Sequence, residues 1–181
     1  MINKNSTSNP MGEVLRDGER LGLRFVRHLP HPVERVWRAI TESDQLRNWM
    51  PCDIVGERRA GSEIELPFWP AQVEKYQIEE TTLRGRIEVW EPPAVFQWTW
   101  GGDVLRFELQ DQSGETMLIF TTWLESSDPE EAAGAAGGYH VCLDELGVLL
   151  DIGSTPPLVD KDDDARRLQD HYAERLSAAL R

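Results

Sequence analysis

The sequence predicts an α+β fold in which a curved antiparallel sheet wraps around one long helix near the C-terminus. Residues 53–124 read as short strands separated by tight turns, a pattern typical of an antiparallel meander. After residue 129 the apolar spacing becomes helical, with a single stripe over residues 131–152. A sheet with one apolar face must cover that face, and this is the only long helix in the core domain. Because a cylinder cannot fill a curved trough completely, we expect an apolar pocket between helix and sheet.

The first elements are a hairpin and two small helices. Residues 1–11 are polar and are expected to be disordered. An Asp-Gly pair between residues 12–16 and 21–29 is a strong hairpin signal. Two prolines then lead into a helical pattern over residues 33–40, and a second short helix is expected over residues 46–50.

The meander follows from the period-two alternation of apolar and polar residues. A corner is expected at Trp69-Pro70-Ala71, and the segment 53–57 is the weakest of the expected strands. The others lie at 62–68, 82–91, 95–100, 104–109 and 116–124.

Seven tryptophans are unusual for a chain of this length. By strand parity, Trp98 and Trp100 point into the trough, whereas Trp90 and Trp123 lie on the outer face. Large apolar side chains on an outer face need a cover, so we expect the C-terminal helix or a second subunit to shield one of them. Trp37 lies on a helical apolar stripe and is expected in the core.

The chain is expected to hold three segments. These are a disordered N-terminus (1–11), the α+β domain (12–153), and an acidic linker with an amphipathic C-terminal helix (154–181). The terminal helix is predicted from the spacing of Leu168, Tyr172 and Leu176.

Composition excludes several classes of protein. The 181 residues carry a net charge of −13, which argues against nucleic acid or an anionic membrane as the main partner. Residues 125–164 alone carry 11 acids and one base, and they form either a solvated linker with a helix start or a site for a cation or basic partner. No apolar run is long enough for a membrane span and no signal peptide is evident, so we expect a cytoplasmic protein.

Three stretches together resemble a known family. They are RHLPHPVERVWRAIT at 27–41, WTWG followed by VLRFEL between 98 and 109, and GYHVCLDEL at 138–146. In this order they resemble the activator-of-heat-shock-protein-90-ATPase-like family of the START/birch-pollen-allergen-like (SRPBCC) superfamily. The resemblance covers roughly residues 12–153 and implies a helix-grip fold, with the long helix held over a ligand cavity. The chain departs from the family pattern at Tyr139, where Trp is usual, and at Thr122, where His is frequent.

No catalytic constellation accompanies the resemblance. Cys142 and His140 are two apart on a helix and lie on different faces, and His28 and His31 lack a metal-ligand spacing. We therefore expect a domain that binds a small hydrophobic molecule, with no cofactor or metal and with no activity or an undefined one.

The aromatic residues and their neighbours define the candidate cavity. Its predicted residues are Trp49, Met50, Phe68, Trp69, Trp98, Trp100, Phe107, Phe120, Thr122, Tyr139, His140 and Leu143. Two alternatives stay open: a co-chaperone-like module that binds a protein partner, and an enzyme of the cyclase or aromatase kind using Tyr139, His140 or Thr122. Assembly into a homodimer stays open as well.

Overall fold

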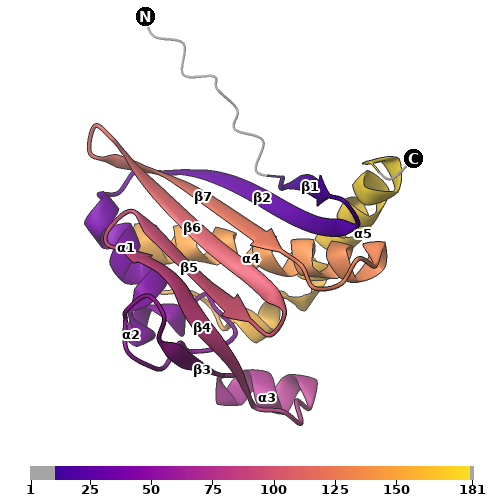
Figure 1. Ribbon diagram of the computed structural model, residues 1–181, viewed down its shortest axis with the longest axis horizontal. Coiled ribbons are helices and arrows are strands. Elements are labelled where there is room, and N and C mark those ends of the chain that lie inside the picture. Colours follow the sequence, from indigo (N-terminus) through magenta and orange to yellow (C-terminus); the bar gives the residue numbers. More distant parts are fainter. Residues whose placement is uncertain (1–10, 180–181) are drawn as a thin grey trace, which may run out of the picture.

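The computed structural model describes residues 11–179, and one seven-stranded antiparallel sheet dominates it (Figure 1). The strand order is β1-β2-β7-β6-β5-β4-β3. All pairs of neighbouring strands except β2 and β7 are therefore consecutive in the chain. The strands are β1 (Glu13–Asp17), β2 (Arg20–Leu29), β3 (Glu63–Pro67), β4 (Thr82–Glu91), β5 (Val95–Trp100), β6 (Asp103–Gln112) and β7 (Glu115–Trp123). The predicted hairpin and meander are both present. Residues 1–11 were expected to be disordered, and residues 1–10 of this segment lie outside the described residues.

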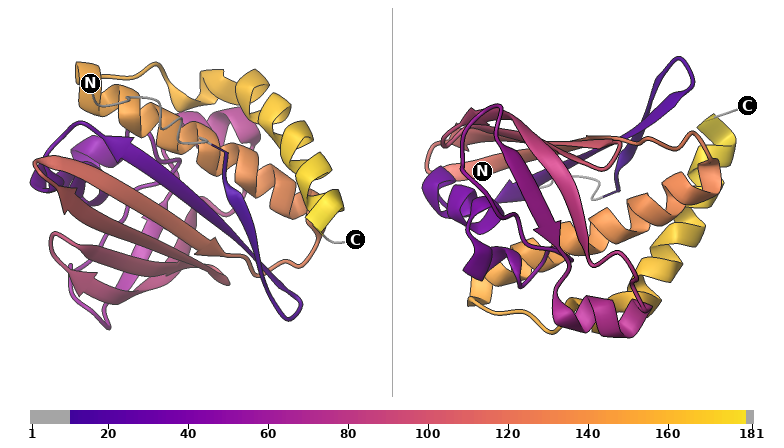
Figure 2. Two further views of the ribbon diagram at one scale, coloured as in Figure 1. Left: turned by 90° about the horizontal axis from the view of Figure 1, so that it is seen from above. Right: turned by 60° about the horizontal axis from the view of Figure 1, so that its bottom comes forward.

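The helices lie on one side of this sheet. They are α1 (Val33–Thr41), α2 (Ser43–Leu46), α3 (Pro70–Tyr76), α4 (Pro129–Ile152), the short 3₁₀ helix η1 (Leu158–Lys161) and α5 (Asp162–Ala179). The long helix α4 crosses the concave face of the sheet, and α5 runs alongside α4 (Figure 2). The predicted α+β architecture is therefore confirmed. None of the helices in the described part of the chain is both long and apolar enough to cross a membrane.

Helix α4 has well-defined ends. The Asp128 side chain accepts hydrogen bonds from the backbone N–H groups of Glu130 and Glu131, at 2.8 and 3.0 Å. Such a cap satisfies N–H groups that lack partners within the helix. The helix ends at Gly153, whose φ of 81° is a left-handed conformation that glycine adopts at low cost.

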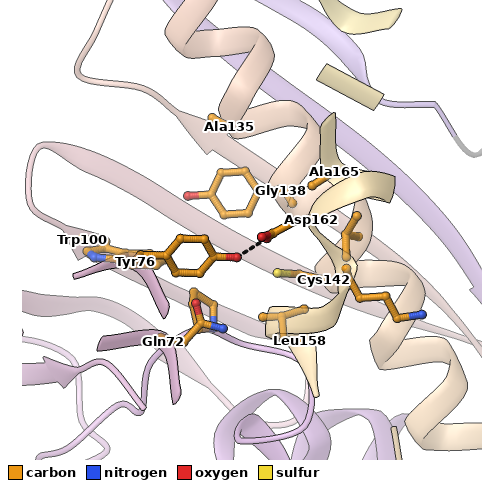
Figure 3. Close-up of a pocket in the computed structure, with 13 residues that line it drawn as sticks. Gln72, Tyr76, Trp100, Ala135, Gly138, Cys142, Leu158, Asp162 and Ala165 are labelled. Carbon is orange, nitrogen blue, oxygen red and sulfur yellow. Dashed lines mark hydrogen bonds between the residues drawn. The ribbon is translucent and has the colours of Figure 1, made fainter. Parts of the chain in front are cut away.

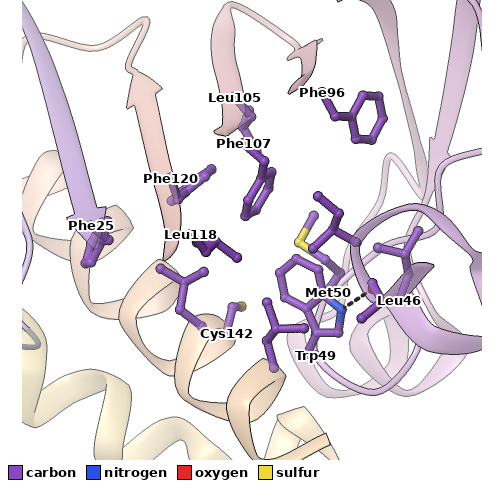
Figure 4. Packing of buried hydrophobic residues seen from close by; sticks show 14 of the residues in the cluster. Phe25, Leu46, Trp49, Met50, Phe96, Leu105, Phe107, Leu118, Phe120 and Cys142 are labelled. Atoms are coloured by element: carbon purple, nitrogen blue, oxygen red, sulfur yellow. Dashed lines mark hydrogen bonds between the residues drawn. The ribbon is translucent and has the colours of Figure 1, made fainter. Parts of the chain in front are cut away.

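Aromatic side chains fill most of the trough between α4 and the sheet. Phe25, Phe120, Phe107 and Phe96 are successive cross-strand partners on β2, β7, β6 and β5. The rings of Phe107 and Phe120 have centroids 4.6 Å apart. Figure 4 shows this row meeting Trp49 from the segment after α2. The centre of the trough is thus packed core.

The predicted position of Trp90 was wrong. The pairing of β4 with β5 shifts between Ile87 and Val89, which is a β-bulge. A bulge adds one residue to one strand and reverses the side-chain alternation beyond it. Trp90 therefore turns inward, with its ring centroid 5.1 Å from those of both Trp37 and Phe96.

Trp123 lies beside Gly22, its pairing partner on β2. The guanidinium carbon of Arg20 is 6.0 Å from the centroid of the Trp123 ring. Helix α5 does not cover Trp123, because it packs on the core side of the sheet. Its Tyr172 is buried, and the ring centroids of Tyr172 and the core residue Phe25 are 6.2 Å apart. The amphipathic helix thus completes the core on the side of α4. Shielding of Trp123 by a second subunit stays a prediction.

Three local expectations also differ from the structure. The second short helix, expected over residues 46–50, lies earlier in the chain, at Ser43–Leu46. The expected corner at 69–71 opens a helix, α3, because Pro70 suits a first helical turn. The weak strand expected at 53–57 makes only one isolated bridge, from Val55 to Glu65.

Candidate functional site

A pocket of about 310 Å³ lies at the edge of the packed trough, where α4 meets α3, η1 and the start of α5 (Figure 3). Its wall is mainly apolar, with polar groups from α3 and from the junction of η1 with α5. The residues that line it are Pro51, Gln72, Tyr76, Trp100, Ala135, Gly138, Tyr139, Val141, Cys142, Leu158, Lys161, Asp162 and Ala165.

The wall near α3 is held by contacts to the C-terminal extension. Lys75 Nζ donates a hydrogen bond to the Val159 carbonyl at 2.8 Å and forms an ion pair with Asp162 at 3.1 Å. The Tyr76 hydroxyl donates to the Asp162 carboxylate. Burial and this hydrogen bond raise the pKa of Tyr76 to about 12, while the same bond lowers the pKa of Asp162. The extension is therefore tied across the pocket.

Two of the predicted cavity residues, Trp100 and Tyr139, line this pocket. Phe68 lies next to the pocket, and the ring centroids of Phe68 and Trp100 are 6.0 Å apart. Trp69 is partly buried and donates its indole N–H to the Met50 carbonyl at 2.8 Å. The rest of the predicted set is buried outside the pocket wall: Trp49, Met50, Trp98, Phe107, Phe120, Thr122, His140 and Leu143.

Trp49, a predicted cavity residue, does not line the pocket. Its side chain is fully buried, and its indole N–H donates to the Ala39 carbonyl at 2.8 Å. It anchors the segment after α2 to helix α1. The pocket lies instead between α3, α4 and the η1–α5 junction.

His140 belongs to a hydrogen-bonded network between α4 and α5. Tyr172 Oη accepts from the Gly12 backbone N–H at 2.7 Å and lies 2.9 Å from His140 Nδ1. His140 Nε2 lies 3.3 Å from Asp144, which also pairs with Arg27. His140 and Asp144 line a separate, charged hollow between the two helices. The network links the residue just before β1 to the C-terminal helix.

Sequence reasoning missed the contribution of α3 and of the C-terminal extension. Gln72 and Tyr76 come from α3, and Leu158, Asp162 and Ala165 come from the segment after Gly153. Proline at position 70 was an available helix-start signal for α3. No local pattern indicated that the extension forms a pocket wall.

Tyr139 and Cys142, two ionisable residues of the pocket wall, are uncharged at neutral pH. Burial, reinforced by nearby Asp103, raises the pKa of Tyr139 well above its usual range. Burial also raises the pKa of Cys142 to about 12, so this residue presents a thiol. The phenol and the thiol can donate hydrogen bonds, and neither is poised as a base or a nucleophile at neutral pH.

The buried thiols predict a loss of stability in alkali. Burial raises the pKa of both Cys52 and Cys142 from 9.0 to about 12. Because the folded pKa exceeds the unfolded one, stability is full below pH 9 and falls as the pH rises toward 12. Urea denaturation at about pH 8 and about pH 10.5 should show a smaller loss in Cys142→Ala than in the wild type, by up to about 2 kcal/mol. Equal losses in the two proteins would contradict the prediction.

A curved antiparallel sheet closed by a long helix, with a pocket at their junction, defines a helix-grip domain of the SRPBCC type. The family model described as "Activator of Hsp90 ATPase homolog 1-like protein" matches residues 30–151. The chain belongs to this family. The match contains the stretches at 98–109 and 138–146 on which the resemblance rests, and most of that at 27–41.

Solved structures share the fold. A conserved protein of unknown function from Enterococcus faecalis, EF2215, is 18% identical with a TM-score of 0.75, covering 92% of this chain and 91% of that one. The protein encoded by gene BPP1335 of Bordetella parapertussis is 27% identical with a TM-score of 0.67, with the same coverages. CalU16 from Micromonospora echinospora is 17% identical with a TM-score of 0.63, covering 92% of this chain and 94% of that one. No curated protein matches the chain.

Proposed function

We propose that this domain binds a small, mainly apolar molecule in the pocket between α3, α4 and the η1–α5 junction. The observation that carries the proposal is the apolar pocket itself, with Trp100 and Tyr139 in its wall. Its volume of about 310 Å³ lies at the lower end of the range for small-molecule sites. This size suits an aromatic or short acyl compound.

The composition of the wall supports this class of ligand. Ala135, Cys142, Leu158 and Ala165 offer hydrocarbon or thiol surface from three elements, and Trp100 adds an aromatic face. Transfer of apolar ligand surface from water into such a site is favourable in proportion to the area buried. The domain acts in this proposal as a binding protein without a defined reaction.

A protein-interaction role is the second candidate function. The family match and the packed aromatic centre of the trough favour it, because a filled core leaves less room for a ligand. Failure of the pocket to take any apolar probe would leave this as the better hypothesis.

Filling the pocket with a side chain tests the proposed function. Gly138 lies in the pocket wall, and a Cβ added there would meet nothing within 4 Å. In Gly138→Leu the new side chain should occupy the ligand space and weaken binding of 2-isopropylnaphthalene by about tenfold or more. Isothermal titration calorimetry measures the affinity, and ligand-observed NMR confirms contact with the protein.

Gly147→Leu is the matched control for this substitution. Gly147 is on the same helix but lies outside the pocket wall, and a Cβ added at this position would also meet nothing within 4 Å. Its substitution should leave the affinity unchanged. Equal affinities of the wild type and Gly138→Leu would place the probe elsewhere and contradict the proposal.

A further inference from the structure

One polar side chain in the apolar pocket has no hydrogen-bonding partner among the residues that the structure describes. Gln72 lies on α3, is only 7% exposed and lines the pocket, where Figure 3 shows its side chain among those of Tyr76 and Leu158. Its backbone N–H is bonded to the Trp69 carbonyl at 2.9 Å, but its side-chain amide bonds to none of the described residues. The amide thus offers two donor hydrogens and one acceptor oxygen to the pocket.

We propose that Gln72 selects, among apolar ligands, those with a hydrogen-bond acceptor beside a donor, as in a neutral carboxamide or lactam. This inference rests on the proposed function. Burial of an amide without partners is costly, so water must bond to it when no ligand is present. A ligand that displaces this water without replacing its hydrogen bonds loses affinity. The oxygen and NH₂ of Gln72 stand side by side, and an amide edge complements both.

The charges around the pocket favour a neutral ligand. Lys161 lines the pocket, but its ammonium is paired with Glu145 at 2.9 Å. Asp162 is likewise engaged, by Lys75 and by Tyr76. A carboxylate ligand would therefore bury its charge without an unpaired cation among the residues of the wall, which is unfavourable.

Three naphthalene probes of similar shape test the inference. They are 2-naphthamide, which carries the complementary edge, 2-isopropylnaphthalene, which lacks it, and 2-naphthoate, which is anionic at neutral pH. The quantity to measure is the ratio of the affinities for 2-naphthamide and 2-isopropylnaphthalene, because the ratio cancels changes that affect both ligands alike. In Gln72→Leu this preference for the amide should fall by about fivefold or more relative to the wild type.

Control variants separate selection from folding. Gln45→Leu, on α2 and outside the pocket wall, should keep the wild-type ratio. Retained binding of 2-isopropylnaphthalene by Gln72→Leu shows that the pocket is intact, and Gln72→Met replaces that variant if its melting temperature falls. In the wild type, 2-naphthoate should bind more weakly than 2-naphthamide.

The outcomes distinguish this inference from the proposed function. If 2-isopropylnaphthalene binds and Gln72→Leu leaves the ratio unchanged, the role of Gln72 is overturned while the pocket stands. Tighter binding of 2-naphthoate than of 2-naphthamide overturns the selection of a neutral ligand. If the wild type binds none of the three probes, the proposed function falls and this inference falls with it.

Discussion

Replacing Tyr172 with alanine is expected to lower the free energy of unfolding by about 3–5 kcal/mol, the usual cost of truncating a buried aromatic side chain. Tyr172 is fully buried although it lies on the C-terminal helix outside the family match. Its ring contacts Phe25 of the sheet and His140 of α4, with centroids 6.2 and 6.0 Å away. The substitution would therefore leave a cavity where three elements meet. Urea denaturation of both proteins measures the difference.

The hydroxyl of Tyr172 contributes separately. Tyr172→Phe keeps the ring but leaves the Gly12 N–H and His140 Nδ1 without this partner, so a smaller loss of about 1–3 kcal/mol is expected. Val55→Ala, at a side chain that is 45% exposed, is the control and should have little effect. A loss below about 1 kcal/mol in Tyr172→Ala would mean that α5 contributes little to folding in solution.

Gly137→Ala is expected to destabilise the protein by about 1–3 kcal/mol, although alanine is the better helix former. A Cβ at residue 137 would lie 2.7 Å from the Ala165 carbonyl oxygen and 3.0 Å from the Gln169 nitrogen. Both atoms belong to the backbone of α5, so the whole helix must shift to relieve the contact. Ala165 lines the pocket, and the same shift should weaken ligand binding.

Gly147→Ala, on the same helix, is expected to change the stability in the opposite direction. A Cβ at residue 147 meets nothing within 4 Å, so only the helix preference acts. This variant should gain up to about 1 kcal/mol. Chemical denaturation of the two variants beside the wild type measures both effects, and changes of the same sign would contradict the close approach of α4 and α5.

The main elements of the fold could be predicted because their signals are local. Period-two alternation located the strands of the meander, and the stripe through Tyr139, Leu143 and Leu146 located α4. The same alternation failed for Trp90, because the bulge between Ile87 and Val89 arises from the pairing of two strands. Parity along one strand carries no information about such an insertion.

The pocket was harder to predict than the fold. Apolar aromatic residues mark both a packed core and a binding site, and periodicity shows only which face of each element is apolar. Most of the predicted cavity residues, including Trp49, Trp98 and Phe107, are buried in the packed core between the elements. Trp100 and Tyr139 stay in a pocket wall because they lie at the end of the trough beside α3.

The sequence by itself determined the order of the main strands and helices apart from α3, the family and the apolar character of the sheet's inner face, since these depend on neighbouring residues and short motifs. Only the tertiary structure decided that the segment after Gly153 closes the pocket, and that Gln72 lies in its wall with no partner among the described residues. The physical reason is that a pocket is the space that packed elements leave between them. Its position depends on contacts between residues far apart in the chain, such as Tyr76 with Asp162.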